Sequence, residues 1–413
     1  MDTPTLTAAE LATLRDHGVV LHADRVIFAA QPALSEARLA EIAAVCAGPL
    51  PASLLALWRL TAGGRLAYDL TLTMHGQSEA ISWCELFFDG SSGYRDLQGW
   101  IDHELELAEE AATEAGTAWS GRLDYLPIGG FEYCDRIYVV TRPGPEHGAV
   151  VAWKQGLPPA WKHRLHAPGV ARVADDLAGA LGALALDDDP LAPTDPYFAG
   201  APLLDYLDER VDRHGLDPAL RDRVIAAFRS AVRDWRSALA AGTLVTSPEL
   251  ARTALLQAIT GDDGAAVTTL AAAGVDLAGP LRGSAGAVAV AVGAGAFVAA
   301  SALVEAGAAV PRDVFDEVDG PLPAALATRL LAAGAEPCAD DVATLVACGA
   351  ADSARVLLAR PRPVAAADLR GAIATLRTSL SRSLTEVQAG RLGHYLGADG
   401  LAARITRLDE FVP

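Results

Sequence analysis

Hydrophobic and polar positions change their period along the first half of the chain. Near the start the spacing is helical: Thr7 and Glu10 have the spacing of a capping box ahead of an apolar helix face. A second helix is expected after Ser35, and a third after Pro51 that ends at the Gly63-Gly64 pair. The chain is therefore expected to open with three short helices, with a strand or hairpin segment at residues 19–28 between the first and the second.

Apolar residues then recur at every second position, as they do in half-buried strands. Strands are expected at residues 66–72, 81–88, 136–141 and 149–153, and a closing helix at residues 173–184. Helices followed by a meander of strands and a last helix predict an α+β domain with an antiparallel sheet and flanking helices.

A segment rich in proline and aspartate, residues 187–196, separates this domain from a purely helical pattern. The predicted organisation is an α+β domain at 1–186, a linker at 187–196, a helical connector or cap at 197–246, and repeats at 247–413. One long helix is expected from Asp217-Pro218 to Leu239.

The helical part contains a degenerate repeat. Residues 269–277 (TLAAAGVDL), 302–310 (ALVEAGAAV) and 329–337 (RLLAAGAEP) align on Gly274, Gly307 and Gly334, which lie 33 and 27 residues apart. A fourth copy has Pro361 in the glycine position, and residues 394–400 offer a fifth. Each glycine suits a left-handed helix end, and helix pairs of this size bury their apolar faces by stacking on neighbours.

Charge narrows the choice of partner. The net charge is −19, and residues 1–189 hold 26 acidic and 13 basic side chains. Nucleic acid would be repelled, whereas the encounter with a basic protein would be accelerated; the alternative reading of the charge is plain solubility. The start of the chain has no signal-peptide pattern, and the apolar stretch at 285–304 is expected to form a buried helix pair. We therefore expect a cytoplasmic protein without a membrane partner.

The search for catalytic chemistry finds no motif for a nucleophile elbow, a zinc protease helix, a P-loop or a dinucleotide fold. His147, His163 and His166 have no carboxylate or cysteine at a ligand spacing, and the five cysteines follow no metal or disulfide pattern. The expectation is a protein that is not an enzyme and has no metal and no cofactor.

A run of six acidic residues between positions 102 and 114 contains no lysine or arginine. On a helix, Asp102, Glu106, Glu109 and Glu110 fall near one face, where like charges cost stability. This face is our candidate partner-binding surface, and a solvated helix face is the alternative. Two tryptophans near it, Trp100 and Trp119, are candidate interface anchors, with burial in the core as the alternative.

The first domain resembles the SUKH superfamily. The likeness lies in a helix that ends in a glycine pair, residues 50–64, and in the strand entry at 125–130 (YLPIGG). The two strands that follow, 135–139 (DRIYV) and 148–153 (GAVVAW), also match. Cys134 stands where a glycine is often found. Many bacterial members are immunity proteins that bind and block a toxin, often a nuclease or a deaminase. The resemblance therefore implies a toxin-binding protein.

The second half is similar to ankyrin repeats, which bind proteins. Residues 253–256 (TALL) lie where that family has its opening Thr-Pro-Leu-His turn, and 269–277 matches its second-helix ending. The predicted function is an immunity protein that neutralises a basic toxin domain of a polymorphic toxin system. A scaffold or regulator without a toxin is the first alternative, and a hydrolase with an unrecognised site the second. A toxin gene immediately upstream would favour the first reading.

Overall fold

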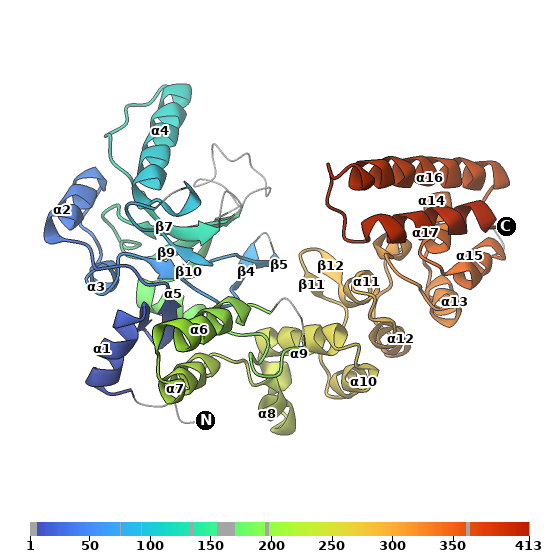
Figure 1. The fold of residues 1–413 in the computed structure, drawn as a ribbon, viewed down its shortest axis with the longest axis horizontal. Helices are drawn as coiled ribbons and strands as arrows, with labels where there is room; N and C mark the ends of the chain where they lie inside the picture. Colours follow the sequence, from blue (N-terminus) through green and yellow to red (C-terminus); the bar gives the residue numbers. More distant parts are fainter. Residues whose placement is uncertain are drawn as a thin grey trace. The chain divides into compact units, whose positions relative to one another are not determined.

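The computed structural model describes residues 6–74, 76–91, 93–131, 135–154, 170–194, 198–360 and 364–412. The chain forms two compact units, Met1–Arg233 and Asp234–Pro413 (Figure 1). Among the described residues, no helix combines the length and the apolar character needed to cross a membrane.

Unit 1 is built on an eight-stranded sheet in the order β1-β2-β3-β6-β7-β8-β9-β10, in which all neighbours are antiparallel. The hairpin β4–β5 forms a separate two-stranded sheet. The antiparallel sheet expected from the alternating pattern is confirmed. The strands are β1 Val19–His22, β2 Arg25–Phe28, β3 Gly64–Arg65, β4 Thr71–Met74, β5 Gln77–Ala80, β6 Glu85–Leu86, β7 Tyr125–Phe131, β8 Asp135–Val140, β9 Val150–Lys154 and β10 Val170–Ala174.

Two predicted strands are shorter than expected. Residues 66–70 are almost entirely buried, but their backbone bonds to three separate partners, Cys84, Ala185 and Ile81, so they form no regular ladder. In the predicted strand at 81–88, only β6 pairs regularly. No residue at 66–70 or 81–88 is exposed, so the alternation of apolar residues there does not indicate a strand with one solvent-exposed face.

The helix predicted at 173–184 begins later. Residues up to Ala174 belong to β10, which pairs with β9 through a bulge. The Asp176 carboxylate accepts the Gly179 N–H at 2.7 Å and so caps the helix at its true start.

Helices flank the sheet, and the capping signals in the sequence locate the first two. Thr7 and Glu10 form the predicted capping box, and the Ser35 hydroxyl accepts the Arg38 N–H. The helices of unit 1 are α1 Ala8–Asp16, α2 Glu36–Val45, α3 Ala52–Trp58, α4 Leu97–Ala115, α5 Leu177–Ala183, α6 Ala201–His214 and α7 Pro218–Arg229, with the 3-10 turn η1 Gly93–Arg95.

Helices α6 and α7 belong to unit 1, although they follow the predicted linker. The Phe228 ring of α7 lies 4.8 Å from that of Tyr68, and the Tyr206 ring of α6 lies 5.3 Å from that of Phe28. The units therefore divide at Arg233 and not within 187–196. The long helix expected from 217 to 239 is two helices, α7 and α8, and one lies on each side of this division.

The segment predicted as a linker is bonded to unit 1 over its described part, residues 187–194. Asp187 pairs with Arg233 at 2.6 Å, and Asp189 makes a two-point contact with the Arg229 guanidinium. Leu186 also exchanges backbone hydrogen bonds with Ala231 and Arg233. Two of the acidic side chains that suggested a solvated linker, Asp187 and Asp189, thus serve as partners for Arg233 and Arg229.

The described residues of unit 2 are helical apart from one short hairpin and the connecting turns. Consecutive helices pair, and α10, α12, α13 and α15 pack in that order beside one another. The apolar stretch at 285–304 forms the expected helix pair, α11 and α12. The elements are α8 Trp235–Ala240, η3 Leu244–Thr246, α9 Pro248–Thr260, α10 Gly264–Ala272, β11 Pro280–Arg282, β12 Ala285–Gly286, α11 Ala287–Gly293, α12 Phe297–Glu305, η4 Val314–Glu317, α13 Ala324–Ala332, α14 Ala339–Ala347, α15 Ala351–Leu358, α16 Ala366–Gln388 and α17 Gly397–Glu410.

The three anchoring glycines end helices as predicted. Gly274, Gly307 and Gly334 have φ of +86°, +84° and +105°, a region that side chains with a Cβ avoid. The interval shortens from 33 to 27 residues between Gly307 and Gly334 because the single turn η4 stands where the preceding interval has β11–β12 and α11. Pro361 lies outside the described residues, and residues 394–400 start α17 instead of ending a helix.

Truncated chains distinguish between the two possible C-terminal boundaries of unit 1, residue 194 and Arg233. A chain ending at Arg233 should unfold cooperatively, whereas one ending at residue 194 should not. The shorter chain lacks four fully buried side chains, Leu203, Leu207, Val224 and Phe228, each worth about 1.5–3 kcal/mol of burial. That loss is comparable to the whole stability of a typical domain. Urea denaturation of both fragments, followed by circular dichroism, gives the answer; equal cooperative transitions would place the boundary at the linker.

The Asp189–Arg229 pair makes a pH-dependent contribution to stability. The Arg229 hydrogen bond is the main influence that lowers the pKa of Asp189, so the pair stabilises unit 1 above the ordinary aspartate pKa and is lost as pH falls through the lowered one. We expect Asp189→Asn to cost about 1 kcal/mol near pH 7 and a smaller amount near pH 3, where part of the contribution is already lost. The exposed Asp205, which forms no ion pair among the described residues, supplies the control Asp205→Asn. Denaturation curves of both variants at the two pH values test this; a loss at Asp189 that is independent of pH would contradict it.

Candidate functional site

Helix α4 carries the predicted acidic surface, and its two ends are well defined. The Asp96 carboxylate accepts the Gly99 N–H at 2.9 Å, and Gly116 ends the helix with φ +64°. All four buried residues of α4 lie in its first half: Leu97, Trp100, Ile101 and Glu104. The second half has none, and in Figure 1 the helix extends away from the sheet.

Trp100 is a core residue and not the surface anchor that the sequence suggested. Only 5% of it is exposed, and its ring stacks on Phe87 with centroids 5.6 Å apart. The Arg136 guanidinium of β8 lies 3.2 Å from the centroid of the same ring, in cation–π geometry. The indole N–H donates to the Tyr94 carbonyl at 2.8 Å. Trp100 therefore holds α4 against the sheet.

Glu104 differs from the other acidic residues of the run because it points inward. It is 3% exposed, and the hydroxyl of Tyr138 on β8 donates to its carboxylate at 2.8 Å. Its position could have been inferred from the sequence, since it lies four residues after Trp100 and seven after Leu97, on the apolar face of the helix.

The remaining predicted carboxylates share one exposed face of α4. We call Asp102, Glu106, Glu109 and Glu110 the acidic stripe. All four are exposed, and among the described residues none of them forms an ion pair. Asp102 accepts a hydrogen bond from the neutral Gln98 amide at 2.6 Å. The helix thus presents four carboxylates that have no cationic partner within the described part of the chain.

Trp119 lies in the loop that follows α4 and is partly exposed. Its indole N–H donates to the Arg122 carbonyl at 3.2 Å, which ties the ring to its own loop. The ring keeps an accessible surface near the end of the helix, so its role as an anchor stays a prediction.

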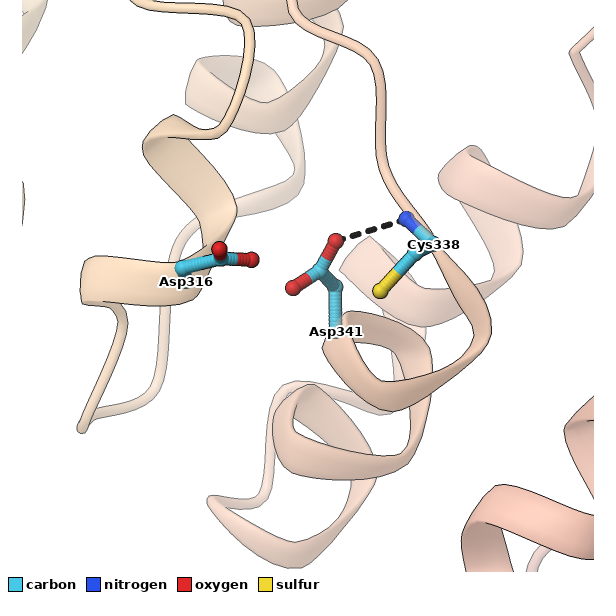
Figure 2. A group of neighbouring side chains, drawn as sticks. All are labelled: Asp316, Cys338 and Asp341. Carbon is cyan, nitrogen blue, oxygen red and sulfur yellow. Dashed lines mark hydrogen bonds between the residues drawn. The ribbon is translucent and has the colours of Figure 1, made fainter.

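A second group of side chains gathers in unit 2. Asp316 of η4, Cys338 at the start of α14 and Asp341 in its first turn place one donor atom each within 4.8 Å of one another (Figure 2). The Cys338 N–H donates to the Asp341 carboxylate at 2.6 Å. In Figure 2 the other Asp341 oxygen points toward Asp316. These are the three described residues whose donors are close enough to hold a metal ion together.

The electrostatics of this group are set by the burial of Asp341, which is 5% exposed. Burial is the main influence on its carboxyl group, and with the neighbouring Asp316 it raises the pKa of Asp341 to about 6. Within the described parts of the chain, neither aspartate forms an ion pair with arginine, lysine or histidine. Two carboxyl groups thus face each other without a cationic side chain.

Sequence reasoning missed this group because only two of its members are close in the chain. Cys338 and Asp341 are three residues apart, at the spacing of a capping box, and that was the available signal. Of the histidines considered earlier, the His147 Nε2 contacts the Pro49 carbonyl at 2.8 Å. His163 and His166 lie outside the described residues.

Two substitutions on α4 compare the stability contribution of its buried carboxylate with that of an exposed one. Glu104→Ala should lower the free energy of unfolding by about 1–3 kcal/mol, because the buried Tyr138 hydroxyl loses this acceptor. Glu109→Ala, one turn further on, should change it by less than about 0.5 kcal/mol. Urea denaturation of both variants provides the comparison. If Glu104→Ala were as mild as Glu109→Ala, the inward placement of Glu104 would be wrong.

Two groups of side chains therefore stand out among the described residues. One is the acidic stripe of unit 1, and the other is Asp316 with Cys338 and Asp341 in unit 2. Comparison of the chain with protein-family models, with curated proteins and with solved structures finds no match.

Proposed function

We propose that this chain is a binding protein whose acidic stripe docks a basic protein partner. Following the SUKH resemblance of residues 1–186, we further propose that the partner is a toxin domain, such as a nuclease or a deaminase, that is neutralised by being bound. The observation that carries the proposal is the acidic stripe itself, four exposed carboxylates on one helix face without an ion pair among the described residues.

The contrast with other acidic residues supports this reading. Many carboxylates of the chain pair with arginines, as Glu36 does with Arg59 and Asp208 with Arg221. Repulsion between like charges three or four residues apart costs roughly 0.2–0.5 kcal/mol for each pair. A helix that bears this cost without compensation is suited to a partner that supplies the counter-charge.

The anchoring of α4 supports the proposal as well. Trp100 and Glu104 fix the first half of the helix to β8, so the carboxylates are presented from a rigid base. Exposed charges of this kind act mainly on the rate of association, because they steer the partner while remaining partly solvated. We therefore expect a fast, salt-sensitive encounter.

Unit 2 fits the same function as a second binding surface. Its paired alanine-rich helices, and the left-handed glycines Gly274, Gly307 and Gly334, support an ankyrin-like stack, an architecture that serves protein binding. This observation also favours the alternative function, an interaction scaffold or regulator that acts without a toxin.

The stripe is tested by charge reversal. Glu106→Lys, Glu109→Lys and Glu110→Lys together should slow association by roughly tenfold or more, within the range of electrostatic steering. The fold should survive because all three side chains are exposed. The measurement is association kinetics at two salt concentrations against the protein encoded by the adjacent gene, where a toxin is expected.

A matched control changes the net charge by the same amount at other positions of unit 1. Asp16, Asp205 and Asp212 on α1 and α6 are exposed and form no ion pair among the described residues, so their reversal to lysine leaves α4 intact. If both triple variants slowed association equally, the effect would come from the net charge of the chain and not from the acidic stripe. Co-expression separates the two functions, since an immunity protein restores growth of cells that produce the toxin and a scaffold does not.

A further inference from the structure

We infer that Asp316, Cys338 and Asp341 form a binding site for a divalent transition-metal ion of the Zn²⁺ class. The site joins η4 to α14, two elements of successive helix pairs. It is independent of the acidic stripe and of the proposed partner.

The geometry supplies the first argument. The three donor atoms lie within 4.8 Å of one another, and two chain segments contribute them. The ligands of a tetrahedral zinc ion stand about 2.0–2.3 Å from the metal. Small side-chain rotations close the remaining gap, because Cys338 and Asp316 are exposed and Asp341 alone is fixed by its hydrogen bond to the Cys338 N–H.

The burial of Asp341 is the second argument, and it is independent of the first. A carboxylate at 5% exposure needs a compensating charge or proton, since desolvating an uncompensated charge is costly. Its second oxygen faces Asp316, another carboxyl group (Figure 2). No arginine, lysine or histidine among the described residues forms an ion pair with either one. A bound cation would supply the missing charge.

The donor set selects the class of metal. A thiolate is a poor ligand for Ca²⁺ and Mg²⁺, which prefer oxygen, whereas one sulfur and two oxygens suit Zn²⁺ or Co²⁺. Coordination replaces the Cys338 thiol proton, which is released to solvent. Three protein ligands leave a fourth position for water.

The competing explanation is a proton shared between the two carboxyl groups, and a metal titration distinguishes the two. The full-length chain without a tag, first treated with a chelator, is titrated with ZnCl₂ in a calorimeter. We expect about one ion per chain. With CoCl₂, the near-ultraviolet absorption of a thiolate–cobalt bond should appear.

Three variants assign the binding to these residues. Cys338→Ser should abolish the thiolate–cobalt absorption and weaken zinc binding by at least about tenfold, and Asp341→Asn should weaken it similarly while keeping the acceptor for the Cys338 N–H. Asp340→Asn, an exposed neighbour on the same helix turn, should leave binding unchanged. Circular dichroism confirms that each variant is folded.

Either of two outcomes would overturn the inference. If calorimetry detects no stoichiometric zinc, the carboxyl pair is held by a shared proton. If zinc binds but Cys338→Ser and Asp341→Asn bind it as the unaltered chain does, the metal is held by other residues.

Discussion

The contact between the Arg136 guanidinium and the Trp100 ring is the interaction on which the arrangement of unit 1 most depends. It places a charged group in the interior, where the closely packed rings of Trp100 and Phe87 make the burial tolerable. The same contact fixes α4 to β8 in the middle of the sheet. Without it, α4 would still be held by the Glu104–Tyr138 hydrogen bond and by the buried Leu97 and Ile101, but its acidic side chains would be presented less rigidly.

Structure is predicted best from the sequence at positions where only one local conformation explains the residue type. Thr7 with Glu10 identifies a helix start because both side chains satisfy free backbone N–H groups. Gly274, Gly307 and Gly334 mark helix ends because a Cβ disfavours positive φ. The antiparallel sheet followed by a helical region could be predicted from the change of period.

Prediction fails where a side chain has two suitable environments. A tryptophan near a loop suits an interface or a core, and the packing on Phe87 and Arg136 that decides for Trp100 comes from strands distant in the sequence. The predicted unit boundary is wrong for a similar reason. Asp187 and Asp189 have the composition of a solvated linker, and their ion-pair partners, Arg233 and Arg229, come from a later part of the chain. The group around Asp341 also depends on a residue more than twenty positions away in the chain.

The single turn η4 has a consequence for how unit 2 unfolds. In a linear array of helix pairs, stability is a sum of the stability of each repeat and the coupling between nearest neighbours. The 3-10 turn Val314–Glu317 has little intrinsic stability and is held in place mainly by its buried side chains Val314 and Phe315. We therefore expect local opening of unit 2 to begin at η4 as well as at the ends of the unit.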